Sequence, residues 1–367
     1  MQEKYMRRAI ELALKGAGHV NPNPMVGCVV VRDGEIIAEG YHEQYGQFHA
    51  ERNALTRLNA RGETAEGADL YVTLEPCCHY GRTPPCTEII IQNKVKRVFV
   101  GSDDPNPKVA GKGFQILREA GIEVIPHVLK EECDQINRIF FHYITHQTPF
   151  VILKYAMTLD GKTACYTGSS QWISGEESRR HVHQTRHRVS GIMTGIGTVL
   201  ADDPMLNCRI PGGVDPKRII CDSSLRIPLD SQIVRTAGEI PTYVAYVRGD
   251  EDKQEALALA GVNLLEIPEK DGRVDLRLLM ERLAREEKID SILLEGGPQL
   301  NFSALSAGIV QKVQAYIAPK LIGGQEAKTP VGGQGLAQMA DAWTLTEVKT
   351  ARFGEDLYME GLLCSQA

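Results

Sequence analysis

The sequence contains no long uninterrupted run of apolar residues, which argues against a membrane-spanning helix. None of its apolar segments approaches the roughly 20 residues that such a helix needs, and the segment from Met25 to Val31 is better explained as a short buried strand. The first ten residues alternate charged with apolar side chains, which indicates an amphipathic helix rather than a secretory signal. We therefore expect a cytoplasmic protein without a membrane partner.

The sequence also has few aromatic residues and no excess of positive charge. Its 41 basic and 47 acidic side chains give a formal charge of −6, and aromatic residues make up only 6% of the chain. Proteins that bind nucleic acids gather phosphates on a basic surface and stack bases on aromatic side chains. This composition disfavours a nucleic acid as partner or substrate and favours a small molecule.

Cysteine is too sparse for a disulfide framework. The nine cysteines, an odd number, are spread over 367 residues, unlike the close pairing found in small secreted proteins. Three of them gather in one short segment, as Cys77, Cys78 and Cys86. This cluster calls for a chemical explanation.

Length and hydrophobic pattern predict two α/β domains. A charged helical stretch from Lys130 to Tyr143 runs towards Pro149, which ends helical continuation, so we place the domains at residues 1–146 and 147–367. In the first domain we expect helices up to about Lys15, from His49, near Pro84 to Gln92 and over Lys112 to Ala120, and strands at Gly27 to Val31, Glu35 to Gly40, Leu70 to Leu74, Arg97 to Gly101 and Glu123 to Ile125, with a hairpin turn at Asp33-Gly34. In the second we expect a helix over Gln299 to Ser306, a terminal antiparallel hairpin within Leu345 to Leu363, and strands at Phe150 to Tyr155, Gly191 to Gly195, Arg218 to Cys221, Thr242 to Val247, Asn263 to Ile267, Ser291 to Leu294 and Lys312 to Ala318.

The first domain carries the residues of a catalytic zinc site. His49 opens a helix, and Cys77 and Cys86 each follow a proline. An imidazole and two thiolates suit zinc, and three protein ligands leave the fourth position open for a water molecule that becomes hydroxide near neutral pH. Glu51, two residues after His49, is placed to carry protons. The alternatives are that the cysteines are ordinary core residues or that the zinc is only structural. Cys78 is expected to be a bystander, since an adjacent side chain cannot readily reach the same metal.

The spacing of the cysteines narrows the family. The segment Leu-Glu-Pro-Cys-Cys-His-Tyr-Gly-Arg-Thr-Pro-Pro-Cys at residues 74–86 places eight residues between Cys77 and Cys86, where the general nucleobase-deaminase signature has two. With this spacing it resembles the bifunctional deaminase and reductase of riboflavin biosynthesis. The resemblance implies a cytidine-deaminase-like three-layer domain followed by a dihydrofolate-reductase-like domain, a homo-oligomer, one Zn²⁺ per chain, and hydrolytic deamination of a diaminopyrimidinone that carries a phosphorylated ribosylamino group.

Two polar loops, Asn21-Pro22-Asn23-Pro24 and Asp104-Pro105-Asn106-Pro107, lie beside strand ends. Their side chains suit either a pyrimidine edge or simple turn formation. Arg82 is the expected phosphate partner, because a guanidinium fork matches phosphate geometry. The resemblance implies a substrate pocket lined by Asn23, His42, His79, Arg82, Asp104 and Asn106.

The second domain has no Gly-x-Gly-x-x-Gly after a strand, so the usual dinucleotide fingerprint is missing. Instead Leu-Leu-Glu-Gly-Gly-Pro at residues 293–298 precedes a helix, which suits a phosphate but equally a tight strand-to-helix connection. The segments at residues 153–162, 170–173 and 197–204 resemble the reductase half of the same riboflavin enzyme. The resemblance implies an NADPH site at Ala156, Trp172, Thr198, Asp202, Ser223, Gly297, Pro298, Gln299, Leu300, Asn301, Phe302 and Ser303.

The same resemblance implies that the reductase converts the ribosyl group to ribityl by hydride transfer to C1 of the sugar. It implies a substrate site at Ser170, Arg186, Leu206, Arg209 and Glu295. The step also needs a proton donor, for which Lys154, Asp202 and Glu295 are the candidates. Their alternatives are a solvated strand end for Lys154, a turn for Asp202 and a helix cap for Glu295. The competing function, a nucleic-acid or nucleotide deaminase fused to an unrelated cofactor-binding module, is at odds with the acidic, aromatic-poor composition.

Overall fold

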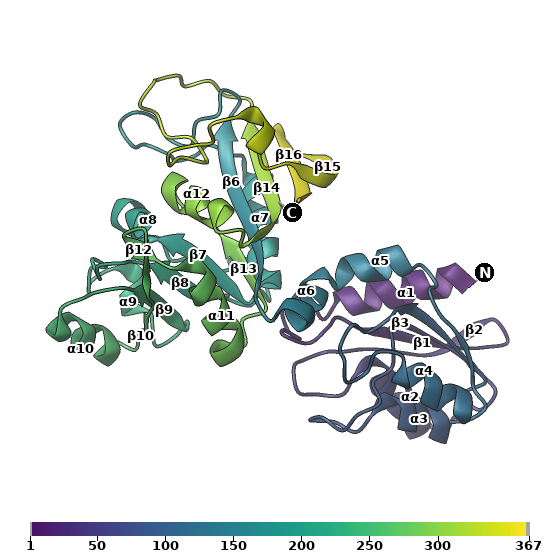
Figure 1. Ribbon diagram of the computed structural model, residues 1–367. Helices are drawn as coiled ribbons and strands as arrows, with labels where there is room; N and C mark the ends of the chain where they lie inside the picture. The colour runs from purple at the N-terminus through teal and green to yellow at the C-terminus, as the bar shows by residue number, and fades with distance from the viewer. Residues whose placement is uncertain (1, 365–367) are drawn as a thin grey trace. The chain divides into compact units, whose positions relative to one another are not determined.

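The computed structural model describes residues 2–364 and divides into two compact units, with the boundary between Gln147 and Thr148. Within the described residues, every helix is too short or too polar to cross a membrane. Each unit is an α/β layer structure with its own core (Figure 1).

The first unit alternates helices and strands along the chain. Its helices are α1 (Gln2–Leu14), α2 (Ala50–Ala60), α3 (Cys86–Gln92), α4 (Lys112–Glu119), α5 (Lys130–Ile136) and α6 (Arg138–His146). Its strands are β1 (Gly27–Arg32), β2 (Glu35–Tyr41), β3 (Asp69–Leu74), β4 (Arg97–Ser102) and β5 (Glu123–Ile125).

The strands of the first unit form one sheet in the order β2-β1-β3-β4-β5, in which β1 is antiparallel to both neighbours and β3, β4 and β5 are parallel. Successive residues of β1 point to opposite faces. Val29 and Val31 pack with α1 and α5, whereas Cys28 and Val30 pack with α2, α3 and α4. The unit therefore has three layers, as Figure 1 shows.

Glycines set how closely two helices approach this sheet. A Cβ on Gly27 would lie 1.9 Å from the carbonyl oxygen of Ala9 in α1. A Cβ on Gly40 would lie 2.5 Å from the carbonyl oxygen of Ala50 and 2.5 Å from the amide nitrogen of Ala54, both in α2. Backbone therefore packs directly against backbone at both positions.

The second unit is built around a larger sheet. Its helices are α7 (Glu176–Arg188), α8 (Ile196–Asp202), α9 (Gln232–Arg235), α10 (Glu251–Leu259), α11 (Leu276–Glu287) and α12 (Pro298–Ser306), with a short 3-10 turn η1 (Met339–Asp341). Its strands are β6 (Phe150–Thr158), β7 (Gly191–Gly195), β8 (Lys217–Cys221), β9 (Thr242–Tyr246), β10 (Asn263–Glu266), β11 (Glu269–Lys270), β12 (Arg273–Val274), β13 (Ser291–Leu294), β14 (Val310–Ala318), β15 (Leu345–Phe353) and β16 (Asp356–Leu363).

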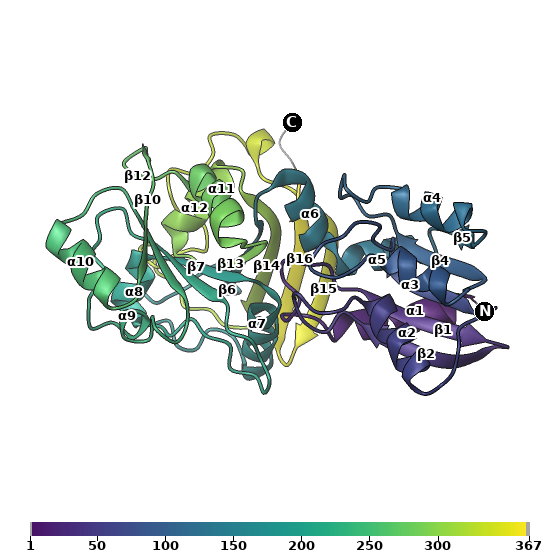
Figure 2. The same cartoon turned by 90° about the horizontal axis from the view of Figure 1, so that it is seen from below.

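Nine of these strands form a sheet in the order β10-β9-β8-β7-β13-β6-β14-β16-β15. The strands from β10 to β14 are parallel, and the terminal hairpin of β15 and β16 adds two antiparallel strands. Helices α11 and α12 cover one face, and α8 and α9 cover the other (Figure 2). The carboxyl ends of parallel strands meet at one edge, where α/β proteins bind ligands.

Most expected elements are confirmed. Asp33 and Gly34, with φ of 51° and 85°, make the turn between β1 and β2, and the terminal hairpin is present. The expected helical stretch from Lys130 to Tyr143 is confirmed as helical, but it is divided at Asn137 into two helices, because α5 ends at Ile136 and α6 begins at Arg138. The side chain of Asn137 accepts from Met25 N at 2.8 Å and donates to Met25 O at 3.0 Å. These two hydrogen bonds join residues far apart in the sequence, so the local hydrophobic pattern could not predict the break between the two helices.

Candidate active sites

His49, Cys77 and Cys86 come together although they lie on three separate segments. His49 is the residue before α2, Cys77 follows β3 by three positions, and Cys86 begins α3. His49 Nδ1 lies 3.4 Å from Cys77 Sγ and 3.6 Å from Cys86 Sγ. All three ligand atoms lie within 4.8 Å of one another.

This cluster fits a zinc ion. Tetrahedral Zn–S and Zn–N bonds place nitrogen and sulfur about 3.5 Å apart, which matches both nitrogen–sulfur distances of His49. Cys78 contributes no atom to the cluster, and its Sγ lies 3.7 Å from the carbonyl oxygen of Lys108. Cys86 is buried and Cys77 is half-buried. Because their thiols converge with the His49 imidazole, these cysteines are not ordinary core residues.

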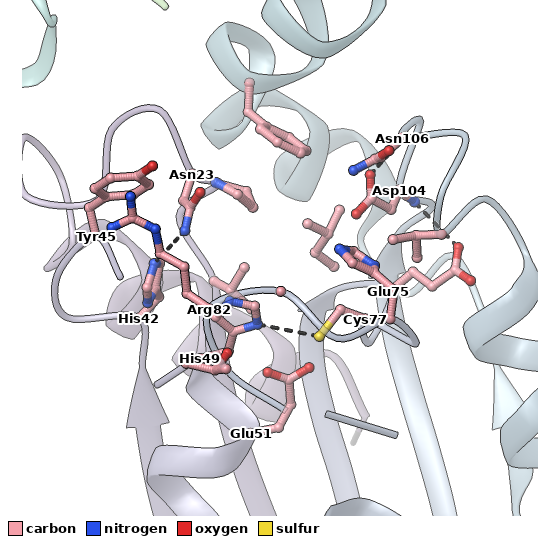
Figure 3. Close-up of a pocket in the computed structure, with 18 of the residues that line it drawn as sticks. Asn23, His42, Tyr45, His49, Glu51, Glu75, Cys77, Arg82, Asp104 and Asn106 are labelled. Carbon is pink, nitrogen blue, oxygen red and sulfur yellow. Dashed lines mark hydrogen bonds between the residues drawn. The ribbon is translucent and has the colours of Figure 1, made fainter. Parts of the chain in front are cut away.

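Glu51 lies at the floor of the same pocket. Its side chain is buried, and Oε2 has no hydrogen-bond partner among residues 2–364. Burial raises the pKa of Glu51 to about 7. Figure 3 shows its carboxylate close to His49 and Cys77. A carboxyl group of this kind can both take up and release a proton near neutral pH.

His42 and Asn23 lie on one side of the pocket (Figure 3). His42 Nδ1 is 3.0 Å from Phe48 O, and His42 Nε2 is 3.1 Å from Asn23 Nδ2. Because a carbonyl oxygen only accepts, the network assigns the proton to Nδ1, and Nε2 accepts from the Asn23 amide. Burial lowers the pKa of His42 to about 4, which keeps the ring neutral. This hydrogen bond holds the Asn23 amide at the pocket wall.

Asp104 and Asn106 lie on the opposite side of the pocket. Asp104 Oδ1 accepts from Asn106 N at 2.8 Å, and Asn106 Oδ1 accepts from Lys108 N at 3.1 Å. Burial raises the pKa of Asp104 to about 6. These side chains therefore form the turn and line the pocket at once, so the two interpretations of this loop do not exclude each other.

Arg82 and His79 also line the pocket. The guanidinium of Arg82 lies over the ring of Tyr45, with its carbon 4.6 Å from the ring centroid. Tyr45 and Phe140 line the pocket without having been expected to. Tyr45 lies four residues before His49, so its nearness to the metal motif was an available signal, whereas Phe140 lies in α6, far from that motif in the sequence.

The second unit contains a buried cluster of charges at the end of β13. Glu295 Oε1 accepts from Arg186 Nε at 2.7 Å, and Glu295 Oε2 accepts from Lys154 Nζ at 3.2 Å. The three side chains are only 12–16% exposed. Burial by itself raises the pKa of a carboxyl, but the Arg186 and Lys154 cations outweigh it and hold the pKa of Glu295 well below its usual range.

Two of the alternatives for this cluster are wrong. Lys154 is not a solvated strand end, because its side chain is 16% exposed and bonded to Glu295. Glu295 does not cap α12, because the residue at the N-terminal cap is Gly297 and no side chain caps the helix. Asp202 is exposed at the end of α8 and, within residues 2–364, forms no hydrogen bond with Lys154 or Glu295. Only two of the three expected proton donors are brought together.

The other expected reductase residues lie on β6 and on segments that follow parallel strands. Gly297 precedes α12, and a Cβ on it would lie 3.9 Å from Thr198 Oγ1 in α8. Arg186 Nη1 donates to Asn207 O at 2.8 Å, which joins α7 to the loop of Leu206 and Arg209. Ala156 lies in β6, Ser223 follows β8, Pro298 to Ser303 open α12, and Ser170 and Trp172 lie in the loop before α7.

Comparisons with known proteins cover both units. The family model "RibD C-terminal domain" matches residues 149–359, and the model "Cytidine and deoxycytidylate deaminase zinc-binding region" matches residues 1–102. The chain is 55% identical to the riboflavin biosynthesis protein RibD of Actinobacillus pleuropneumoniae over 98% of this chain and 95% of the relative.

Solved structures of similar proteins also cover both units. The chain is similar to Acinetobacter baumannii RibD, form 1, with a TM-score of 0.87, 37% identity and 99% of each chain covered. It is also similar to a Thermotoga maritima diaminohydroxyphosphoribosylaminopyrimidine deaminase/5-amino-6-(5-phosphoribosylamino)uracil reductase, with a TM-score of 0.85, 37% identity, and 99% of this chain and 98% of the other covered. The expected fold class, a cytidine-deaminase-like domain followed by a dihydrofolate-reductase-like domain, is confirmed.

Proposed function

Because the chain belongs to the RibD family of bifunctional riboflavin biosynthesis enzymes, we propose that residues 1–146 form its zinc-dependent deaminase and residues 147–367 its NADPH-dependent reductase. The substrate is a small phosphorylated pyrimidine. The deaminase replaces the ring amine of a diaminopyrimidinone ribosylamino phosphate by oxygen and releases ammonia. The reductase then converts the ribosyl group of the product to ribityl. The alternative, a nucleic-acid deaminase fused to an unrelated module, is not favoured, since RibD relatives span the whole chain.

For the deaminase, the convergence of His49, Cys77 and Cys86 is the observation that carries the proposal. One zinc ion held by these three residues would supply hydroxide at neutral pH. Glu51, with a pKa of about 7, would take up the proton that a water molecule releases on forming this hydroxide and would deliver it to the departing amine, which leaves as ammonia.

The remaining pocket residues bind and orient the pyrimidine. Asn23, held by His42, and the Asp104 and Asn106 side chains face each other across the pocket and match the donors and acceptors of a pyrimidine edge. Arg82 binds the phosphate at the exposed side of the pocket. His79, which also lines the pocket, completes the substrate site.

For the reductase, the charge cluster supports a choice among the candidate proton donors. NADPH would supply the hydride to C1 of the sugar in its imine form. Glu295 is ionised at neutral pH, since its pKa lies far below the usual range, and therefore cannot donate. Lys154, which Glu295 holds at 3.2 Å, is assigned as the donor, and Arg186 binds the substrate phosphate together with Arg209. Ser170 and Leu206 complete the substrate site.

The cofactor occupies the carboxyl edge of the parallel strands. The turn from Gly297 to Ser303 binds a phosphate of NADPH at the start of α12. The other cofactor contacts are assigned to Ala156, Trp172, Thr198, Asp202 and Ser223 on the neighbouring segments.

We further propose a homo-oligomer located in the cytoplasm. The large sheet ends in β15, most of whose residues are exposed. Such an edge strand is available for pairing with a second copy.

The test separates the two activities in one chain. With the diaminopyrimidinone substrate and NADPH, Glu51→Gln is expected to stop ammonia release, yet to oxidise NADPH at the wild-type rate when given the deaminated product. Lys154→Gln should show the reverse pattern. Simultaneous loss of both activities in either folded variant would contradict the assignment of one activity to each unit.

A further inference from the structure

Glu75 is a buried carboxylate beside the deaminase pocket to which the zinc chemistry assigns no part. It follows β3 directly and precedes Cys77 by two residues. Its side chain is 3% exposed and contributes no atom to the metal cluster. A buried charge of this kind needs partners that satisfy its oxygens.

The partners of Glu75 are main-chain amides of one segment. Oε1 accepts from Gly113 N at 3.0 Å and from Phe114 N at 3.4 Å. Oε2 accepts from Gly111 N at 3.0 Å and from Asp104 N at 3.5 Å. One carboxylate therefore binds both ends of the segment 104–114, which includes the Asp104–Asn106 loop and the first turn of α4.

One backbone hydrogen bond and the close packing of Gly113 hold Glu75 itself in place. Its amide donates to Ser102 O at 2.9 Å, which continues the pairing of β3 with β4. A Cβ on Gly113 would lie 2.3 Å from Pro76 O and 3.0 Å from Glu75 Oε1, so this close approach requires glycine. Figure 3 shows Glu75 on the same side of the pocket as Asp104 and Asn106, opposite Asn23 and Tyr45.

We propose that Glu75 is a positioning residue of the deaminase, whose carboxylate fixes Asp104 and Asn106 against the pyrimidine by collecting the amides of the segment that carries them. The inference rests on the proposed deaminase function and extends it. Glu75 contributes no atom to the metal cluster, so loss of its contacts should misplace the substrate without releasing zinc.

The test is the isosteric change Glu75→Gln in the full-length enzyme. One oxygen is then replaced by an NH₂ group that faces the amides of Gly111 or Gly113, so half of the contacts become donor against donor. A misplacement of about 1 Å can lower a rate about 100-fold, and we expect a fall of that size in kcat/KM for ammonia release. Zinc content and the reductase rate should stay at wild-type values. The control Glu119→Gln changes an exposed carboxylate of α4 and should leave all three unchanged.

A double variant distinguishes positioning from a general structural role. If Glu75 acts through Asn106, then Asn106→Ala should cost far less in the Glu75→Gln background than in the wild type. Independent multiplication of the two losses would overturn the proposal. So would zinc loss in parallel with activity, or kinetics for Glu75→Gln equal to those of Glu119→Gln. Gly113→Ala, which keeps the carboxylate but displaces the segment, should reproduce the kinetic defect and provides a second variant if Glu75→Gln folds poorly. Absence of ammonia release by the wild type would instead refute the proposed function.

Discussion

Replacing Glu295 by glutamine is expected to destabilise the second unit measurably and in a pH-dependent way. The change keeps the shape of the side chain but removes the negative charge between Arg186 and Lys154. Both cations are 16% exposed or less, so water compensates them poorly. Removing one partner of a buried ion pair costs about 3 to 5 kcal/mol, and since these groups retain some contact with water we expect about 3 kcal/mol of lost unfolding free energy.

The pH dependence follows from the direction of the shift. The pKa of Glu295 is lowered in the folded state, whereas an unfolded glutamate has a pKa of about 4.3. The stabilisation is therefore fully present above the unfolded pKa and is lost as the pH falls through that value towards the folded pKa. The difference between wild type and Glu295→Gln should be constant from about pH 6 to pH 8 and should shrink below about pH 4.

Urea unfolding followed by tryptophan fluorescence is a suitable assay. The chain has two tryptophans, Trp172 and Trp343, and both belong to the second unit. A matched control is Glu286→Gln, which removes an exposed ion pair with Arg282 and should cost no more than about 0.5 kcal/mol. The reasoning would be refuted if both variants lost the same stability, or if the loss for Glu295→Gln did not diminish at low pH.

Two other changes test the metal cluster and the core of the second unit. Cys77→Ser should reduce bound zinc severely, whereas Cys78→Ser should keep it near wild type by elemental analysis; zinc loss from the second variant alone would show that the wrong cysteine was chosen. Arg218 is fully buried and donates to Thr242 Oγ1, Thr236 Oγ1 and Ile233 O at 2.8–2.9 Å. Arg218→Met should therefore lower the urea unfolding free energy by about 3 kcal/mol, and a loss no larger than that of the exposed Arg248→Met would contradict this.

The convergence of His49, Cys77 and Cys86 was predictable because metal-binding chemistry depends on residue type and spacing. His49, Cys77 and Cys86 each follow a recognisable local signal, and the parallel strands place them at one edge. Glu75 belongs to the same motif, but its role depends on amides about 30 to 40 positions later, which no local pattern reveals. Asn137 is a similar case, since its clamp on Met25 spans the length of the unit.

In the second unit, too, local sequence predicted some features, whereas others depend on residues far apart in the chain. The strand pattern was readable, because buried parallel strands appear as short apolar runs. The ionisation of Glu295 was not, since it depends on Lys154 and Arg186 from elsewhere in the chain. The sequence alone left Lys154, Asp202 and Glu295 as equal candidates for proton donation.

The lack of a side chain at Gly40 has a consequence for the position of His49 in the metal cluster. A methyl group there would meet Ala50 O at 2.5 Å, whereas ordinary contact begins near 3.4 Å, so the helix would have to retreat by roughly 1 Å. Metal–ligand distances tolerate only about 0.2 Å, and the imidazole of His49 sits at the end of that helix. The geometry of the metal site is thus fixed partly by a glycine in β2, whose missing side chain lets the first turn of α2 pack against the sheet.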